Sequence, residues 1–383
     1  MSVSVYIKSL LGFTLALALL VVGFNYVVDP YAITGVTRIE GLNARKTDIN
    51  NYTRLSKKYQ PLDAQYTALI VGNSRVEMGL NPQHQCFQSA GQRVYNLGIP
   101  GASLRQQLAY AMNVIYQQPV EQVWLSLDFT DFLLWQGGEI LGLVDFDEYS
   151  VDGLEYLPSG ESNPQYFQQQ WMDYYKSLFS LDATISSLKT VLTQSSQGPD
   201  RDTQGFNPAR DFGRAVAVEG PAALFAQKME VLENSYDRPL YLRNDNGRLG
   251  HPFRDLQRFL DLAGKQSVSV VAFTNPFHEQ YWGLFERYGL MPLYREWQTV
   301  IVEQMQQNQV PLWDFSADSE FIHEPVPASG KKTGPLQWFW EPAHYREQLG
   351  DRMIEAIVPG CDGERAGFGI RVAWKGRLES RPT

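Results

Sequence analysis

The sequence predicts an α/β protein with a mostly parallel sheet, preceded by an N-terminal transmembrane helix and interrupted by a largely helical insertion. Short apolar runs typical of buried strands alternate with longer segments of helical periodicity. This alternation favours parallel strands with helices on both faces of the sheet. A chain of 383 residues can bury one large core or two modest ones.

The N-terminal segment is apolar enough to cross a bilayer. Leu10–Val28 contains only Thr14 and Asn25 as polar side chains, and its 19 residues match the thickness of the hydrocarbon core. Because no clear cleavage motif follows, we expect residues 1–30 to be an uncleaved signal anchor, with a cleaved leader as the alternative. Basic residues flank the span on both sides, so their bias is weak; we expect the long C-terminal part to be translocated.

The rest of the chain is divided by its local patterns. Asp29-Pro30 ends the first helix, and residues 31–61 are predicted to form a polar, membrane-proximal connector. Residues 62–360 form the main domain, and residues 361–383 a tail without an assigned function. The expected strands are Ala68–Val71, Val94–Leu97, Val123–Leu127, Val268–Phe273 and Val310–Trp313. The expected helices are Leu104–Gln117, Pro252–Ala263, Leu293–Gln307 and Arg346–Ile357.

The alternation breaks between about residues 137 and 237, a segment rich in aromatic and acidic residues. We expect this segment to be an insertion that caps one edge of the sheet. Gln165–Leu192 is predicted to be a long helical stretch. Trp171, Tyr174 and Tyr175 could stack on sugar rings, but their helical spacing favours positions in a core.

Composition and ligand spacing limit the partners and cofactors. The chain has 42 acidic and 33 basic residues without a basic stripe, which argues against nucleic-acid binding. We expect neither a metal nor a cofactor, because His323-Glu324 has no second ligand at i+3 or i+4. Cys86 and Cys361 would pair in an oxidising compartment or remain two free thiols, and their spacing leaves both alternatives open.

Ser74 is the first candidate for chemistry because it follows a predicted strand almost directly. A helix that begins there would place free backbone N–H groups beside the hydroxyl, where they could hold an oxyanion. The amides of Ser74 and Gly98 are the natural donors for this purpose. The segment lacks the second glycine of a G-x-S-x-G elbow, which disfavours an ordinary α/β-hydrolase.

A serine nucleophile needs a base, and His344 is the best candidate because Glu341 precedes it by three residues. Glu341 would hold the Nδ1–H of His344 and leave Nε2 facing Ser74. The alternative makes Glu341 an acid at a helix N-terminus and His344 a surface residue, and these residues alone leave both open. His278 also follows a strand and is a rival base, although packing within its loop is the preferred interpretation.

Polar residues follow each predicted strand, where the carboxyl ends of parallel strands share one rim. Arg75 would contact an anionic substrate or pair with Glu77 or Asp131, and the pair is the preferred interpretation. The remaining candidates for substrate or secondary contacts at this rim are Asn73, Asp128, Asp131, Asn275 and His278.

Together these residues resemble the SGNH/GDSL-type hydrolase superfamily, and most closely its membrane-anchored bacterial branch associated with acylation of extracellular polysaccharide and cell wall. The likeness covers most of residues 20–358. Its blocks are Gly72-Asn73-Ser74-Arg75, Asn96-Leu97-Gly98-Ile99-Pro100-Gly101-Ala102 and Glu341-Pro342-Ala343-His344-Tyr345, preceded by Val28-Asp29-Pro30-Tyr31 and Asn43-Ala44-Arg45-Lys46.

The resemblance implies a flavodoxin-like, three-layer α/β/α domain that faces the periplasm. It also implies a triad of Ser74, His344 and Glu341, with the Ser74 and Gly98 amides in the oxyanion hole. The family's last block is usually Asp-x-x-His, and glutamate in its place reaches one methylene further.

Two positions depart from the family pattern. Asn73 stands where the family often has aspartate, and Asp128 and Asp131 stand where the third block usually supplies an asparagine donor. An ionised aspartate accepts hydrogen bonds but does not donate them. Losing one oxyanion donor costs about 10²–10³ in rate.

The sequence therefore favours a serine esterase or O-acyltransferase, with acetyl as the expected acyl group, that modifies an extracellular polysaccharide. Residues 10–28 would anchor it in the bacterial inner membrane as a single-pass protein, with a multi-span acyltransferase or a secretion complex as the expected partner. The choice between esterase and transferase depends on the exclusion of water and stays open. The alternative is a catalytically inactive, glycan-binding or scaffold subunit of a polysaccharide secretion complex.

Overall fold

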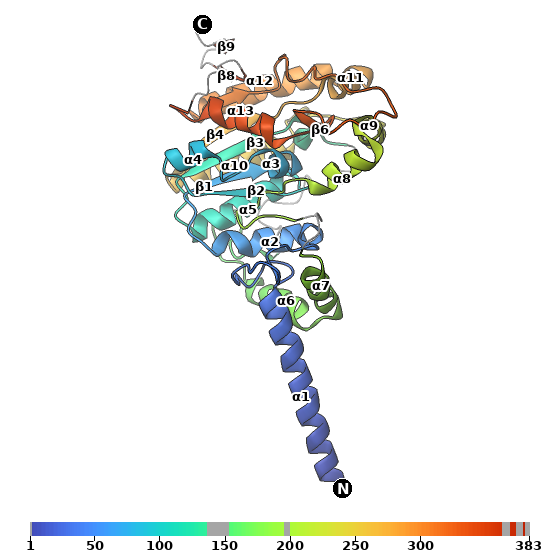
Figure 1. Cartoon of the computed structure of the whole chain (residues 1–383). Coiled ribbons are helices and arrows are strands. Elements are labelled where there is room, and N and C mark those ends of the chain that lie inside the picture. The colour runs from blue at the N-terminus through green and yellow to red at the C-terminus, as the bar shows by residue number, and fades with distance from the viewer. Residues whose placement is uncertain (1, 136–152, 195–199, 362–367, 373–377, 380–383) are drawn as a thin grey trace.

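The computed structural model describes residues 2–135, 153–194, 200–361, 368–372 and 378–379. Within these residues the protein is a mixed α/β structure with a mostly parallel central sheet (Figure 1). An N-terminal helix projects from the body (Figure 1). The predicted start of the insertion near residue 137 lies outside the described residues.

The predicted strands are confirmed, with bounds that differ by at most two residues. Their order in the sheet is β2-β1-β3-β4-β5, and all four pairings are parallel. The crossover from β1 to β2 runs to one side of β1, and the crossover from β2 to β3 runs back to the other side. This reversal of strand order creates a switch point at the carboxyl end of β1. The strands are β1 (Ala68–Gly72), β2 (Val94–Gly98), β3 (Gln122–Leu127), β4 (Ser269–Thr274) and β5 (Leu312–Asp314).

Part of the predicted C-terminal tail belongs to the sheet. Strand β8 (Ile370–Val372) pairs antiparallel with β5, and β9 (Leu378–Glu379) pairs antiparallel with β8. A short strand added at an edge has a weak sequence signal, because only two or three residues carry it. The other tail residues after Cys361, apart from Phe368 and Gly369, lie outside the described part of the chain.

Helices pack on both faces of the sheet because alternate side chains of each strand point in opposite directions. Leu69 and Val71 join one apolar cluster with α5, α10 and α12, whereas Ala68 and Ile70 join another with α3, α4 and α13. The four predicted helices are confirmed as α5, α10, α12 and α13. The six helices that line the two faces are α3 (Ser74–Gly79), α4 (Gln85–Ser89), α5 (Leu104–Gln117), α10 (His251–Lys265), α12 (Met291–Gln307) and α13 (Glu347–Ile357).

The remaining elements lie between these helices or beside the sheet. A two-stranded ribbon of β6 (Phe339–Glu341) and β7 (His344–Tyr345) precedes α13, and α11 (Glu279–Arg287) follows β4. Helix α2 (Thr53–Tyr59) belongs to the connector. Short 3₁₀ turns cover Ile49–Tyr52, Gln60–Leu62 and Phe129–Phe132.

The predicted long helix in the insertion is two helices, α6 (Tyr166–Phe179) and α7 (Leu181–Leu192). The backbone is extended at Ser180, whose side chain accepts from the Ala183 N–H at 3.0 Å and caps α7. Both helices pack against α1 rather than against the sheet edge (Figure 1). Further along the insertion come α8 (Arg210–Glu219) and α9 (Pro221–Tyr236).

A different part of the insertion covers the β2 edge of the sheet. The Asn96 N–H donates to the Gln204 carbonyl at 2.8 Å, and the Gln204 side chain donates to the Val94 carbonyl at 3.0 Å. An exposed edge strand would leave these backbone groups free to pair with another chain.

Helix α1 (Val3–Val28) is long and apolar enough to cross a membrane, a property that a signal sequence shares. Its C-terminal end is built into the body by the connector. Asn43 donates to the Val27 carbonyl at 2.9 Å, and the buried Lys46 ammonium donates to the Val28 carbonyl at 3.0 Å. A cation at this end also interacts favourably with the helix dipole.

Cys86 and Cys361 form a disulfide, which resolves the alternative that the sequence left open. The bond joins α4 to the segment after α13 across a sequence separation of 275 residues. It therefore links the early and late parts of the domain on the same face of the sheet.

Candidate active site

Ser74 is the first residue of α3, directly after the turn that leaves β1. Asn73 caps this helix, and its side-chain oxygen accepts from the Arg75 N–H at 3.0 Å. Gly72 is required before the turn, because a Cβ there would lie 2.7 Å from the Ser126 Cβ. The Ser74 N–H has no hydrogen-bond partner among the described residues, so it is free to bind an anion.

The β6–β7 ribbon brings His344 and Glu341 to Ser74. Ser74 Oγ lies 2.7 Å from His344 Nε2, although the two residues are 270 positions apart. On the other side of the ring, His344 Nδ1 is bonded to a Glu341 carboxylate oxygen. The sequence alternative of a surface histidine and a helix-terminal acid is therefore wrong, and α13 begins only at Glu347.

The electrostatics of Glu341 suit a group that orients a histidine. Glu341 is 1% exposed, and its second oxygen accepts from the Ala343 N–H at 3.1 Å. Burial raises the pKa of this carboxyl. The adjacent His344 and the Ala343 amide lower the pKa by more than burial raises it, so the net pKa lies below the usual value. An ionised Glu341 holds the Nδ1–H tautomer of His344 and leaves Nε2 able to accept a proton from Ser74.

Arg75 fixes the loop between Glu341 and His344 instead of facing solvent. Its Nε donates to the Ala343 carbonyl at 2.9 Å, and one terminal nitrogen pairs with Asp128 at 2.8 Å. The predicted ion pair exists, but the partner is Asp128 rather than Glu77 or Asp131. Arg75 is 7% exposed and is a positioning residue of the site.

Asp128 and its neighbours form a buried network behind Ser74. The Asn73 amide donates to Asp128 at 2.5 Å, and the Asn275 amide donates to the other Asp128 oxygen at 3.0 Å. Asn275 also accepts from the Tyr345 hydroxyl at 3.0 Å. Asn73, Asp128 and Asn275 therefore hold the strand ends together, and their polar groups are occupied within the protein.

Asp131 lies at the border of this network. It accepts from the Gln107 amide at 2.8 Å and from the Asn73 amide at 3.3 Å. Burial and the neighbouring Asp128 raise the pKa of Asp131 to about 7. A protonated Asp131 would be a hydrogen-bond donor, whereas the ionised form is only an acceptor.

His278 is a structural residue, as the preferred interpretation of its loop position had it. It caps α11, where Nδ1 accepts from the Gln280 N–H at 3.2 Å, and Nε2 lies 2.8 Å from the Glu324 carbonyl. Both ring nitrogens are thus occupied. The His278 N–H donates to the Pro342 carbonyl at 3.1 Å, so this residue also supports the loop that carries His344.

The second expected oxyanion donor is occupied. The Gly98 N–H donates to the Asn96 side-chain oxygen at 2.9 Å. Asn96 is held in place by its own amide, which donates to the Val76 and Leu80 carbonyls at 2.7 and 2.8 Å. Of the two expected donors, the Ser74 amide alone is free in this structure.

Two aromatic side chains near His344, Phe212 and Trp340, were not predicted from the sequence. The Phe212 ring of α8 lies 6.0 Å from the His344 ring, and the Trp340 ring lies 6.3 Å from Phe212. The Lys228 ammonium of α9 stands 5.2 Å from the centre of the Phe212 ring. Amphipathic helices of an insertion give no sequence signal of proximity to a site, because only the fold places them there.

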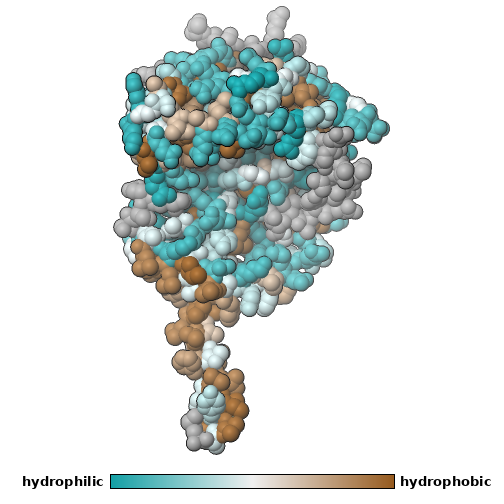
Figure 2. Space-filling model, turned by 90° about the vertical axis from the view of Figure 1, so that its right-hand side faces the viewer, coloured by the Kyte–Doolittle hydropathy of each residue, from teal (hydrophilic) through white to brown (hydrophobic). Residues whose placement is uncertain are grey.

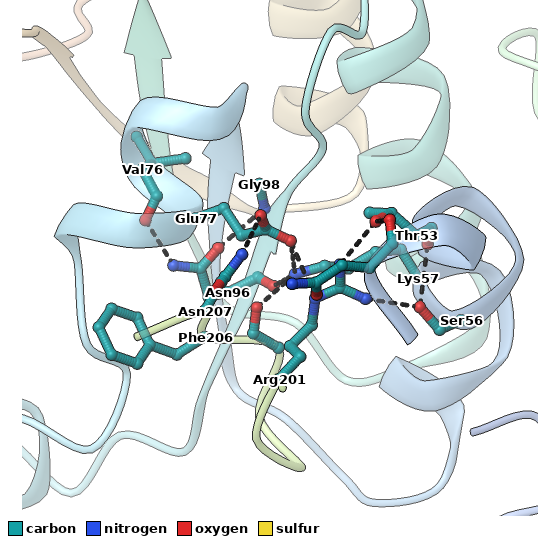
Figure 3. A network of polar contacts seen from close by, with 12 residues as sticks. Thr53, Ser56, Lys57, Val76, Glu77, Asn96, Gly98, Arg201, Phe206 and Asn207 are labelled. Carbon is teal, nitrogen blue, oxygen red and sulfur yellow. Dashed lines mark hydrogen bonds and ion pairs between the residues drawn. The ribbon is translucent and has the colours of Figure 1, made fainter. Parts of the chain in front are cut away.

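A buried ionic network supports the helix that carries Ser74 (Figure 3). Glu77, on that helix, is 2.9 Å from Arg201 and 3.8 Å from Lys57, and all three side chains are fully buried. Arg201 also donates to Ser56 and Thr53 at 2.8 and 2.6 Å. The network therefore ties α3 to the connector helix α2 and to the insertion.

The described residues contain no group of three or more His, Cys, Asp or Glu side chains placed to hold a metal ion. No protein-family model matches the sequence, and a search of curated proteins finds no match. Function is therefore inferred from the geometry of the site.

Proposed function

We propose that the protein is a membrane-anchored serine esterase or O-acyltransferase of SGNH type. The observation that carries the proposal is the continuous chain of hydrogen bonds from Ser74 through His344 to Glu341. A nucleophile, a base and an orienting acid in hydrogen-bond contact form the arrangement that activates serine in covalent catalysis. The strand order 2-1-3-4-5, with helices on both faces, supports a flavodoxin-like three-layer domain.

In the proposed reaction, Ser74 Oγ attacks the carbonyl carbon of an ester while His344 Nε2 takes the hydroxyl proton. The Ser74 N–H stabilises the oxyanion. The tetrahedral intermediate then expels the alcohol, which receives the proton from His344, and an acyl-serine remains. Water or a sugar hydroxyl attacks the acyl-serine, again losing its proton to His344, and regenerates Ser74. Water gives esterase activity, and a sugar hydroxyl gives transferase activity.

An uncleaved anchor in the bacterial inner membrane with the domain in the periplasm is part of the proposal. The buried Asn25 side chain of α1 donates to the Leu178 carbonyl at 2.8 Å, so the end of this helix belongs to the folded body. A cleaved leader would be absent from the mature protein and could not make this contact. The Cys86–Cys361 disulfide supports an oxidising compartment.

The proposed substrate is an acylated or acyl-accepting polysaccharide. Sugar rings stack on aromatic side chains, and the half-buried Phe212 ring lies next to His344. A multi-span membrane acyltransferase or a secretion complex is the proposed partner, as the resemblance to the membrane-anchored SGNH branch implies.

A catalytically inactive glycan-binding or scaffold subunit is the second candidate. The Gly98 amide already donates to Asn96. Asp128, at a position where the family usually has an asparagine donor, pairs with Arg75 and accepts from Asn73. The free Ser74 amide would then be the sole backbone donor of the expected pair for an oxyanion.

The two candidates are separated by ester hydrolysis in the full chain, solubilised in detergent. The esterase proposal expects hydrolysis of a small acetyl ester that is abolished in Ser74→Ala and in His344→Gln. The matched control is His323→Gln, because His323 also contacts two carboxylates, Glu279 and Asp318, but lies on the surface. Equal slow hydrolysis in all four proteins, without covalent capture of Ser74 by a fluorophosphonate, would support the inactive subunit.

A further inference from the structure

The hairpin formed by α6 and α7 carries its apolar side chains on the outside. On α7 the buried positions hold small or polar residues, and the exposed positions hold leucine and isoleucine, the reverse of a helix that covers a core in water. The buried residues are Ala183, Ser186, Ser187 and Thr190. The exposed residues are Leu181, Ile185, Leu188 and Leu192, of which Leu181 is 74% exposed.

Helix α6 shows the same inversion with aromatic side chains. Its buried positions are Asp173 and Ser177. Its exposed stripe repeats every four residues and consists of Phe167, Trp171, Tyr175 and Phe179. The expected core positions of Trp171 and Tyr175 are therefore wrong: these side chains are 58% and 47% exposed, and their rings stack on each other at 5.3 Å.

The hairpin lies where α1 enters the body. The Asn25 side chain donates to the Leu178 carbonyl and to Thr184 Oγ1 at 2.8 and 3.1 Å, and it accepts from Ser187 Oγ at 2.8 Å. The end of α6 and the first half of α7, on either side of the turn at Ser180, are thus level with Asn25. At a rise of about 1.5 Å per residue, Asn25 lies roughly 4.5 Å before the end of α1 at Val28, which is the edge of the apolar span.

We propose that the α6–α7 hairpin lies in the membrane interface beside α1, with its exposed stripes in contact with lipid at the boundary between headgroups and acyl chains. The proposal rests on α1 spanning the membrane. Apolar surface continues from α1 onto the adjoining base of the body, whereas the face above is largely hydrophilic (Figure 2).

Lipid is favoured over a protein partner by the composition of the stripes. Tryptophan and tyrosine are enriched at membrane–water interfaces, and α6 presents both toward the outside. The exposed Lys176, Asp182 and Lys189 flank the stripes, so the hairpin lies in the interface and not in the hydrocarbon centre. The hairpin would also complete the anchor, because it satisfies the polar Asn25 side chain near the end of α1.

Fluorescence quenching by lipids with brominated acyl chains tests this proposal on the full chain in nanodiscs. The native cysteines are paired, so a single new cysteine can carry an environment-sensitive fluorophore. Leu181→Cys and Leu188→Cys report on the hairpin, and Leu20→Cys reports on α1. Val231→Cys is the matched negative control, because Val231 is an exposed apolar residue of α9 at 57%.

The expected result is a loss of emission at positions 181 and 188 similar to that at position 20, without loss at position 231. Unchanged emission at 181 and 188 with quenching at 20 would overturn the proposal and leave a protein as the occupant of the stripes. No quenching at position 20 would remove the transmembrane premise as well. An unaltered thermal midpoint shows that a labelled variant is folded, and the two hairpin positions test the proposal independently.

Discussion

The replacement Glu77→Gln tests how the helix that carries Ser74 is held. Glu77 is the carboxylate that balances two fully buried cations, Arg201 at 2.9 Å and Lys57 at 3.8 Å. Glutamine keeps the shape but removes the negative charge. Arg201 then keeps only neutral acceptors, namely the glutamine side-chain oxygen and the hydroxyl oxygens of Ser56 and Thr53.

The expected cost follows from leaving buried charge unbalanced. Breaking a buried ion pair by neutralising one partner costs about 3–5 kcal/mol of unfolding free energy. Burial lowers the pKa of Lys57 to about 7. In the unfolded chain lysine stays protonated up to its ordinary pKa of 10.5. Between about pH 7 and this value the unfolded state therefore binds more protons than the folded state, so the free energy of unfolding rises with pH.

Loss of the Glu77 charge lowers the pKa of Lys57 further, so this rise begins at a lower pH in the variant. The cost of Glu77→Gln is therefore greatest below about pH 7, where Lys57 is charged in the unmodified protein. The assay is denaturant unfolding of the full chain in detergent at pH 6 and pH 9, followed by tryptophan fluorescence.

The matched control is Glu355→Gln, which removes a partly exposed ion pair with Arg352, whose charged groups are 2.8 Å apart. Such pairs contribute about 0.2–1 kcal/mol. If Glu77→Gln costs no more than Glu355→Gln at pH 6, the ionic network does not hold α3, and the reasoning is refuted.

Three further predictions address the triad, the strand-end network and helix packing. Glu341→Gln is expected to lower kcat for a small ester by about 10⁴, since His344 loses the charge that fixes its tautomer; an unchanged kcat would exclude Glu341 from the triad. Asp131 holds its proton to about pH 7 in the folded state, so stability falls as pH rises from its ordinary pKa of 3.8 to about 7. Denaturation at several pH values should show this fall, and Asp131→Asn should flatten it; an equal slope in both proteins would contradict it. Gly350→Ala places a Cβ 1.7 Å from the Gly79 carbonyl oxygen and should lower the thermal midpoint, at a cost of about 1–3 kcal/mol. The control Gly283→Ala meets no atom within 4 Å, and equal midpoints in these two variants would refute the steric argument.

Local patterns predicted the parts of the protein that depend on a few neighbouring residues. The strands from Ala68 and Val94 were found from short apolar runs, and α5 was predicted with its observed bounds. The pairing of His344 with Glu341 was proposed from a spacing of three residues. A general rule, that residues after parallel strands meet at one rim of the sheet, led us to expect His344 and Ser74 at the same rim. Their direct contact is seen only in the structure.

The errors concern choices that only the three-dimensional packing decides. Arg75 had several carboxylates within plausible reach, and the strand register selected Asp128. Trp171 and Tyr175 have the periodicity of a buried face, but periodicity does not say whether protein or lipid covers it. The capture of Gly98 is different, because asparagine two residues before an amide is a known local motif that the sequence contained.

That capture also decides how the two candidate functions can be distinguished. Asn96 Oδ1 cannot turn away from the Gly98 N–H unless its amide gives up two carbonyls of the Ser74 helix and the turn that follows it, at 2.7 and 2.8 Å. Without the Gly98 donor, an active enzyme would be slower by about 10²–10³ than one with a complete oxyanion hole. A low rate is therefore expected from the esterase and is no evidence for an inactive subunit. Dependence of that rate on Ser74 separates the two, since a scaffold has no use for the hydroxyl.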